Sequence, residues 1–255
     1  MHNPQIVNGL QTSSEIHRFL INNPDRIEQE KRSVLIRVIV PEDEETRDRI
    51  IRATNSQTPI PKSSLRATDN IHRSIEDYFK PRGMYYDRRK NYYKNEGKKP
   101  KEIVSLPFLS QCLMSTLLQR PDSARARPST LLENDESYEK LFHQSNALNT
   151  YFVVASWGRS IDLRLKELKK YETAEISDIK FYVLYYFCCS KVTSLYPSNA
   201  KISGLENSDI EDAEIDAASD ICYDIYRELG GTDKVAKGTV YLEKIKEKLK
   251  QEFEL

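Results

Sequence analysis

The stretch from Ile179 to Tyr196 is apolar almost all the way around a helix, and it constrains the fold more than any other part of the chain. A helix without a polar face must be covered on all sides by other elements. Its longest apolar run, Phe181 to Cys189, is too short to cross a bilayer. We therefore expect this helix to lie at the centre of a helical bundle.

From Ser105 to the end of the chain, apolar residues recur at helical spacing. Ser105 is placed to cap the first helix, and Arg120-Pro121 ends it. Further helical patterns run from Val154 to Leu168, from a Ser208 cap to Gly230-Gly231, and from Leu242 to Phe253. The sequence therefore predicts a helical domain over residues 103–255.

Residues 1–102 mix strand and helix patterns. Val34–Val40 is β-branched and almost continuously apolar, which predicts a strand buried on both faces. Pro41 follows, and the acidic run Glu42–Glu45 favours the start of a helix, because acids stabilise the positive end of the helix dipole. The expected fold class is α+β and predominantly helical, with a small mixed sheet near the N-terminus followed by a helical bundle. The expected domains are residues 1–102 and 103–255.

Composition limits the chemistry that the chain can perform. The 255 residues carry 39 basic and 39 acidic side chains, so any basic surface must be local. Four cysteines form no C-x-x-C pattern, and four histidines have no ligand spacing, so neither a disulfide framework nor a metal site is predicted. The cysteines are Cys112, Cys188, Cys189 and Cys222. With a polar N-terminus and no membrane span, a cytoplasmic protein is expected.

The first candidate site is the turn Asn8-Gly9-Leu10-Gln11-Thr12, which follows an apolar pair and precedes a helix. Thr12 and Glu15 have the spacing of a capping box, so the helix is expected to open at Thr12. Helix N-termini direct unpaired N–H groups outward and can hold anions. The turn is either an anion site or only a tight turn before a capped helix, and the spacing alone favours the second interpretation.

The second candidate is the segment Lys80–Lys101, hereafter the basic segment. It holds nine Lys or Arg residues against two acids, with four tyrosines between them. Basic side chains with aromatic neighbours suit a nucleic-acid backbone and unstacked bases. The predicted contacts are Tyr85, Tyr86, Arg88, Arg89, Lys90 and Lys94. The alternative is a solvated hairpin or strand whose tyrosines pack inward. If the contacts are correct, replacing Arg88 and Arg89 together by Ala should abolish binding.

A complete catalytic set is not visible in the sequence. There is no G-x-G-x-x-G, no G-x-x-x-x-G-K-[ST] and no G-x-S-x-G motif. Glu167-Leu168-Lys169 has the spacing of a nuclease motif, but residues two apart on a helix do not converge. The sequence therefore assigns no catalytic residue and no cofactor.

Three stretches occur in a characteristic order. Pro4–Thr12 reads PQIVNGLQT, Ala53–Gln57 reads ATNSQ and Tyr85–Lys90 reads YYDRRK. In this order they resemble the signatures of the prokaryotic AIPR family, which is named for abortive-infection phage resistance. The similarity covers about the first 145 residues well. The resemblance implies a role in bacterial defence against phage.

The resemblance also suggests a remoter similarity to DGQHR-type proteins such as DndB and to the ParB/sulfiredoxin-type fold. In that fold the corresponding turn and helix N-terminus hold nucleotide phosphates. On this analogy Asn8, Gly9, Gln11 and Thr12 line a phosphate or nucleotide site. Asn55 and Gln57 would support it.

Members of the family carry a longer N-terminal part, so the resemblance implies that this chain is a C-terminal portion. The expected function is a defence protein that binds DNA, RNA or a nucleotide, with no complete catalytic site in this chain and no membrane partner. One alternative is an interaction subunit that docks a toxin or nuclease. Another is half of a nucleotide hydrolase, completed by a partner chain that carries the missing N-terminal half.

Overall fold

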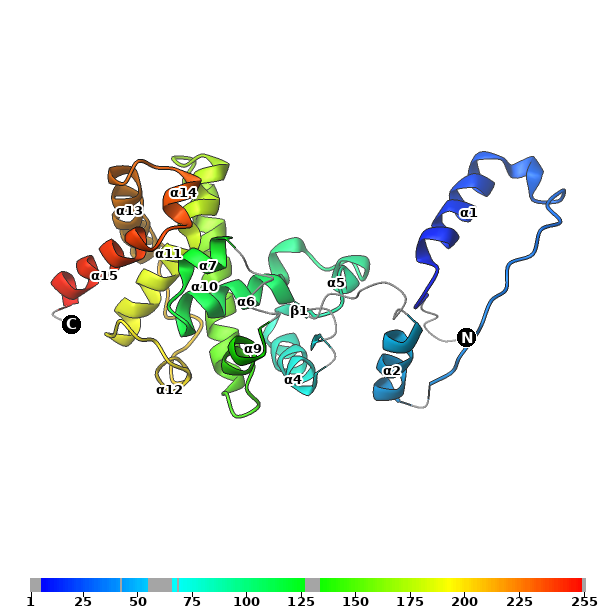
Figure 1. Ribbon diagram of the computed structural model, residues 1–255, viewed down its shortest axis with the longest axis horizontal. Coiled ribbons are helices and arrows are strands. Elements are labelled where there is room, and N and C mark those ends of the chain that lie inside the picture. Colours follow the sequence, from blue (N-terminus) through cyan, green and yellow to red (C-terminus); the bar gives the residue numbers. More distant parts are fainter. Residues whose placement is uncertain (1–5, 42, 55–65, 68, 127–133, 254–255) are drawn as a thin grey trace. The chain divides into compact units, whose positions relative to one another are not determined.

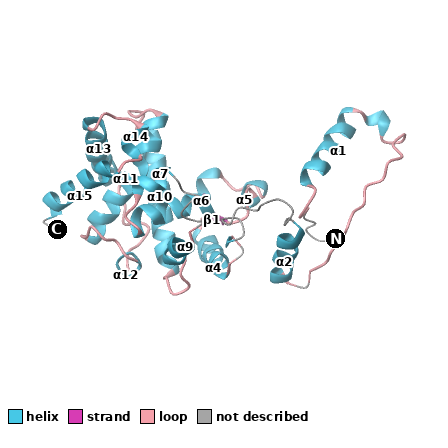
Figure 2. Cartoon of the chain, in the orientation of Figure 1, coloured by secondary structure: helices cyan, strands magenta, loops and turns pink. Residues whose placement is uncertain are grey.

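The computed structural model describes residues 6–41, 43–54, 66–67, 69–126 and 134–253 (Figure 1). The chain divides into two compact units, Met1–Leu65 and Arg66–Leu255. Figure 2 shows that the described ranges are predominantly helical, with one short pair of strands. The predicted fold class, α+β and predominantly helical, is confirmed.

The N-terminal unit holds α1 (Leu10–Asn22), the 3-10 turn η1 (Pro24–Arg26) and α2 (Glu44–Thr54). α1 ends at Asn22, and just beyond it the Asn23 side chain donates to the carbonyl of Phe19 at 2.9 Å. The strand predicted at Val34–Val40 is wrong, because these residues form no ladder and Leu35 is 97% exposed. A strand needs a neighbour to pair its N–H and C=O groups, and the described residues of this unit contain no second strand.

The C-terminal unit begins with α4, β1 and β2, and the rest of it is helical. β1 (Tyr85–Asp87) pairs in parallel with β2 (Ile103–Ser105), and Tyr86 lies opposite Val104. The 3-10 turns are η2 (Lys80–Arg82) and η3 (Pro100–Glu102). The helices are α4 (Asn70–Phe79), α5 (Tyr92–Asn95), α6 (Leu106–Leu117), α7 (Pro121–Ala126), α9 (Asp135–Leu141), α10 (Leu148–Glu167), α11 (Thr173–Val192), α12 (Asn199–Ile202), α13 (Asp212–Glu228), α14 (Asp233–Ala236) and α15 (Thr239–Phe253).

The core of this unit is built around α11, as the apolar stretch predicts. α11 packs against α6, α7, α10, α13 and α15, and Tyr182, Tyr185 and Phe187 are fully buried. α10 approaches α6 closely at Gly158, where a Cβ atom would lie only 2.6 Å from Cys112 Sγ. All four cysteines are buried and free. Burial raises the pKa of Cys112 to about 12, so its thiol is inert at neutral pH.

Two of the predicted helix ends are confirmed and one is wrong. The Ser105 hydroxyl accepts a hydrogen bond from the Phe108 N–H and caps α6, and Gly230-Gly231, both with positive φ, follow α13. Ser208 does not cap α13, which begins four residues later with Glu211 as its N-cap. Glu211 and Glu214 form a reciprocal capping box, which satisfies two backbone N–H groups where Ser208 would satisfy one.

The division between compact units does not fall where the sequence predicted a domain boundary. The units meet at residues 65 and 66, whereas the prediction was near residue 102. β1 and β2 are paired and lie on either side of that position, so residues 85–105 belong to one unit. None of the helices in the described ranges combines the length and apolar character needed to cross a membrane.

Candidate nucleic-acid interface

The turn at Asn8–Thr12 differs from the prediction in where its helix begins. Gly9 is the N-cap of α1 and has a φ of 82°, a left-handed conformation that suits glycine. α1 therefore starts at Leu10, and Thr12 lies inside the first turn. The predicted capping box is wrong, because Thr12 is not the N-cap, and the Glu15 side chain instead pairs with Arg18 one turn along the helix.

The same turn is held against the end of α2. The Asn8 side-chain amide donates a hydrogen bond to the carbonyl of Thr54 at 2.7 Å. Thr54 belongs to the ATNSQ stretch, so the structure brings two of the three family-like motifs together. Gln11 and Thr12 are exposed beside this contact. The other two predicted residues, Asn55 and Gln57, lie outside the described residues.

The basic segment spans η2, β1, α5 and η3, and three consecutive residues in it, Tyr86 to Arg88, are buried. Tyr86 occupies the middle of β1 and is 0% exposed. Its hydroxyl lies 2.8 Å from Nδ1 of His72 on α4, and Nε2 of His72 lies 3.0 Å from the Tyr138 hydroxyl. Tyr138 in turn donates to the Asp69 carboxylate at 2.7 Å. All these contacts are satisfied when Tyr86 donates to Nδ1 and Nε2–H donates to Tyr138.

This arrangement requires a neutral His72. A protonated imidazole would present N–H to Tyr86, which would then lose the acceptor of its own O–H. Burial depresses the pKa of His72 to about 3, with smaller contributions from the positive charges of Arg88 and Arg66. The histidine therefore has a structural role at neutral pH.

A second buried cluster surrounds Glu76 of α4. Its carboxylate accepts from Arg88 Nε and, at 2.7 Å, from the Tyr93 hydroxyl, while an Arg89 nitrogen lies 3.7 Å away. Arg88 is buried and Tyr93 is 4% exposed. Tyr86, Tyr93 and Arg88 thus pack inward, which agrees with the alternative interpretation for these three residues.

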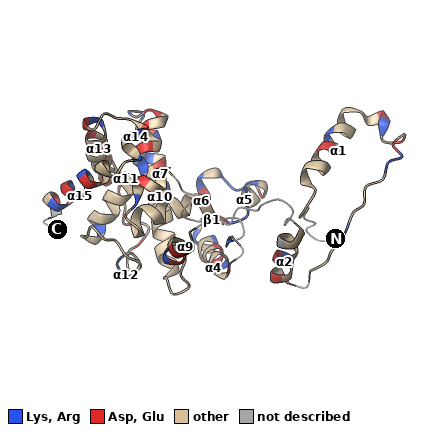
Figure 3. Ribbon diagram, viewed as in Figure 1, with Lys and Arg blue, Asp and Glu red and all other residues tan. Residues whose placement is uncertain are grey.

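The seven remaining cations of the basic segment are exposed or half-buried, and among them Arg82 packs on the Tyr78 ring and donates to the Tyr78 carbonyl at 2.8 Å. In the part of the chain that the structure describes, they form no ion pair with an acid. The exposed ones are Lys80, Arg82, Lys90, Lys94, Lys99 and Lys101, and Lys98 is half-buried. The Asp87 carboxylate is buried and accepts the backbone N–H groups of Asn91 and Tyr92 at 2.8 and 3.1 Å. Figure 3 shows the resulting row of Lys and Arg along the stretch from α5 to α6.

Two half-buried tyrosines lie among these cations. The rings of Tyr85 and Tyr92 each pack on Tyr93, with centroids 5.1 and 5.0 Å apart. Lys98 lies 4.7 Å from the ring centre of Tyr85, and Arg89 lies 4.0 Å from that of Tyr92. Of the predicted contacts, the structure thus leaves Tyr85, Arg89, Lys90 and Lys94 at least partly accessible. The predicted contacts did not include Lys80, Arg82, Lys98, Lys99 and Lys101, although the charge of these residues alone could have indicated them.

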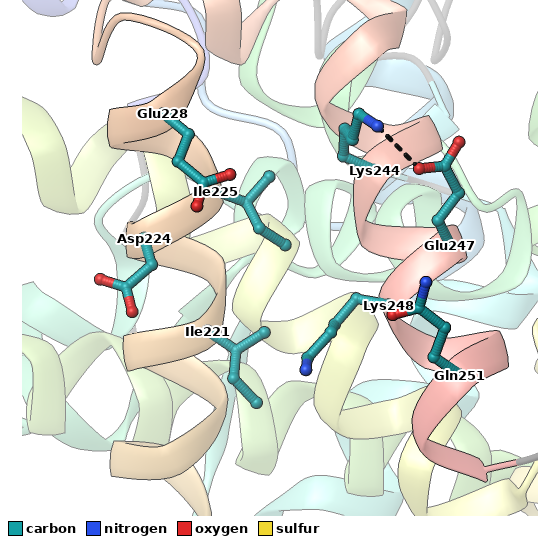
Figure 4. A pocket seen from close by; sticks show the side chains of 8 residues that line it. All are labelled: Ile221, Asp224, Ile225, Glu228, Lys244, Glu247, Lys248 and Gln251. Atoms are coloured by element: carbon teal, nitrogen blue, oxygen red, sulfur yellow. Dashed lines mark hydrogen bonds and ion pairs between the residues drawn. The ribbon is translucent and has the colours of Figure 1, made fainter.

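Among the described residues, no group of three or more His, Cys, Asp and Glu side chains could hold a metal ion. A groove between α13 and α15 has Ile221 and Ile225 facing α15 (Figure 4). Its other side carries Lys248 and the pair Lys244–Glu247, whose charged groups lie 2.9 Å apart. These charged groups lie on exposed positions of α15.

Comparison with known proteins gives one match. Searches of curated proteins and of solved structures found no counterpart. The family model described as AIPR protein matches residues 1–237, which include both motifs joined at Asn8 and Thr54 and the entire basic segment. Because this match covers nearly all of its length, the chain belongs to the AIPR family, a family of abortive-infection defence against phage.

Proposed function

We propose that this AIPR protein is a cytoplasmic, nucleic-acid-binding component of abortive-infection defence, and that the exposed cations of the basic segment bind phosphates. The proposal rests on the division of the cations of this segment into two groups, those that face a buried acid and those that do not. Arg88 and Arg89 face the buried carboxylate of Glu76, whereas seven other cations have no acid partner among the described residues. The binding groups are therefore the exposed lysines and Arg82, with Tyr85 and Tyr92 beside them.

Electrostatics supports this proposal over a merely solvated surface. The whole chain has a formal net charge of zero, so an unneutralised cluster is a local feature. Such a cluster attracts a polyanion, because each bound phosphate releases condensed counterions. Half-buried tyrosines beside the cations add rings on which unstacked bases can pack.

The triple variant Lys90→Gln, Lys94→Gln and Lys99→Gln tests this assignment. We expect its affinity for a labelled oligonucleotide to fall about 100-fold at 0.1 M salt, with a salt dependence shallower by about 2 logarithmic units per decade. Fluorescence anisotropy at several salt concentrations measures both quantities. The matched control is Lys201→Gln, Lys248→Gln and Lys250→Gln, which removes the same charge from exposed positions elsewhere. Equal loss in both variants, or an unchanged slope in the first, would contradict the proposal.

A second candidate is a nucleotide phosphate held at the Asn8–Thr12 turn, and the hydrogen bond from Asn8 to Thr54 supports it. The remote similarity to DndB and ParB-type proteins belongs to this proposal, as do Asn55 and Gln57 as supporting residues. This second candidate also includes a partner chain, which would supply an N-terminal half and complete a nucleotide hydrolase. An interaction subunit for a toxin or nuclease is the remaining alternative.

Asn8→Ala tests the second candidate. Loss of one side-chain hydrogen bond that orders the turn should raise the dissociation constant for ATP or GTP about 10-fold. Isothermal titration calorimetry measures this, with Asn22→Ala at the exposed end of α1 as the control. The turn is not a nucleotide site if neither nucleotide binds the unaltered protein, or if both variants bind equally.

A further inference from the structure

A second group of cations lies outside the basic segment, where α10 and α11 pack beside α6. Arg159 and Lys166 come from α10, and Lys180 comes from α11. They surround Asp162 of α10, which is only 5% exposed. The group also includes the half-buried ring of Phe108 on α6. We call these five residues the Phe108 cluster.

The charge of Asp162 does not account for all three cations. Its Oδ2 accepts a hydrogen bond from Lys166 Nζ at 2.6 Å, and this one pair already neutralises the carboxylate. Lys180 Nζ lies farther away, 3.4 Å from Oδ1, and Arg159 Nη1 lies 4.0 Å from Oδ2. Three positive charges thus surround one negative charge, and the cluster has a net positive charge.

Arg159 and Lys180 keep donors for a ligand. Arg159 Nη2 donates to the carbonyl of Ile103, and among the described residues no other nitrogen of this guanidinium makes a hydrogen bond. The Lys180 ammonium group donates to Asp162 over the long distance of 3.4 Å. Guanidinium and ammonium groups with donors left over are the usual ligands of phosphate oxygens.

The same two cations border the Phe108 ring. The guanidinium carbon of Arg159 lies 4.8 Å from the ring centre, and Lys180 Nζ lies 5.9 Å from it. The ring packs on α10 at Gly158, where a Cβ atom would lie 3.5 Å from the Phe108 Cζ. Proteins stack unpaired bases on aromatic rings and on guanidinium planes. The cluster therefore combines a stacking surface with phosphate donors.

The Phe108 cluster is continuous with the basic segment. Arg159 donates to the carbonyl of Ile103, which is the first residue of β2. Lys101 of η3 is exposed and lies two residues before Ile103, a backbone distance of at most about 7 Å. Glu102 is the single acid between Lys101 and Ile103, and cations outnumber it on both sides. One bound strand can therefore contact η3 and Arg159 together.

We propose that a single strand bound at the basic segment continues onto the Phe108 cluster, where an unpaired base stacks on Phe108 and the flanking phosphate binds Arg159 and Lys180. This inference rests on the nucleic-acid binding proposed above and specifies the ligand as single-stranded. A duplex keeps its bases stacked on one another, so it offers phosphates to the cluster but no base to the ring.

Replacing Phe108 by Leu tests the stacking. Affinity for an oligothymidylate of about 16 nucleotides should fall about 10-fold, because one stacked base is lost. Affinity for a duplex of the same length should change less than about 2-fold. The matched control is Tyr223→Leu, at another half-buried ring with a guanidinium 6.0 Å from its centre, and it should change neither affinity. Equal losses for strand and duplex, or equal losses in both variants, would overturn the inference.

Replacing Lys180 by Gln tests the phosphate contact. The dissociation constant for the same strand should rise about 5-fold at 0.1 M salt, with a salt dependence shallower by about 0.7 logarithmic units per decade. The matched control is Lys191→Gln on the same helix, whose side chain is also 24% exposed and also pairs with an acid, Glu214. If the triple lysine variant of the basic segment loses affinity and Lys180→Gln does not, the proposed function stands and the extension onto the Phe108 cluster is overturned.

Photo-cross-linking tests the same contact without a substitution. On irradiation, a strand that carries 5-iodouracil joins the aromatic side chain on which that base stacks, with loss of hydrogen iodide. Trypsin then releases residues 102–120, in which Phe108 is the only aromatic residue. We expect fragment mass spectra to place an adduct on Phe108 that an excess of unlabelled strand suppresses. Adducts confined to the tyrosines of the basic segment would overturn the extension alone, whereas absence of binding would overturn the proposed function as well.

Discussion

Replacing Arg88 by Ala is expected to lower the free energy of unfolding by about 3 to 5 kcal/mol. The substitution removes the main partner of the buried Glu76 carboxylate and leaves, among the described residues, the Tyr93 hydroxyl and the more distant Arg89. A buried charge without its partner cannot recover its hydration. Because domains of this kind have total stabilities of about 5–15 kcal/mol, the variant should be close to unfolding at room temperature. Urea unfolding followed by circular dichroism measures the change.

Two controls separate this structural role from a binding role. Arg89→Ala should cost less than about 1 kcal/mol, because its guanidinium is partly exposed and 3.7 Å from the same carboxylate. Replacing Glu76 and Arg88 together by Met and Leu should be far less harmful than Arg88→Ala, because no charge then remains buried. An Arg88→Ala protein as stable as the unaltered one would show that the pair is not buried. Loss of nucleic-acid binding in an Arg88, Arg89 double variant would therefore report unfolding and not a missing contact.

Acidification from pH 7 to pH 4 is expected to destabilise the C-terminal unit by about 3 kcal/mol through His72 alone. The pKa of His72 is about 3 in the folded protein, against an ordinary value of 6.5. Between these values the unfolded chain binds a proton that the folded chain excludes. The contribution of the neutral imidazole is therefore complete above pH 6.5 and is lost progressively as the pH falls toward 3.

His72→Gln isolates this contribution. An amide in place of the imidazole can keep part of the hydrogen bonding to Tyr86 and Tyr138 but has no proton to gain. The variant should be less stable than the unaltered protein at pH 7, and the difference should shrink by about 3 kcal/mol at pH 4. Other titrating groups act in both proteins and cancel in the comparison. A difference that stays constant with pH would show that His72 is accessible to protons in the folded state.

The sequence predicted the helical part well because its signals are local. α11 is apolar on all sides, and Ser105 caps α6 by a bond to a residue three positions away. The starts of α1 and α13 were mislocated because two cap patterns competed within a few residues. At α1 the left-handed Gly9 begins the helix before Thr12 can cap it. At α13 the Glu211 and Glu214 pair satisfies more N–H groups than Ser208.

The strand at Val34–Val40 was mispredicted for a different reason. Its composition is that of a buried strand, but a strand forms only when another chain segment pairs with it. The sequence reported the apolar character correctly, and the described part of the unit contains no partner strand.

Part of the candidate site could be predicted and part could not. The excess of positive charge in the basic segment is visible in the sequence, and in the structure most of its lysines are exposed. Glu76 decides which cations form buried ion pairs. This acid lies between Ile75 and Phe79 on the buried face of α4. A buried acid requires a buried base, but its identity as Arg88 appears only once β1 is packed on α4.

The most direct test of nucleic-acid binding is the salt dependence of affinity for the unaltered protein. Labelled single-stranded and duplex oligonucleotides are titrated between 50 and 200 mM salt, and log Kd is plotted against log salt concentration. Contacts from at least three of the exposed cations predict a linear plot with a slope of about 2 or more. Absence of binding at the lowest salt, or an affinity that does not change with salt, would contradict phosphate recognition by the basic segment.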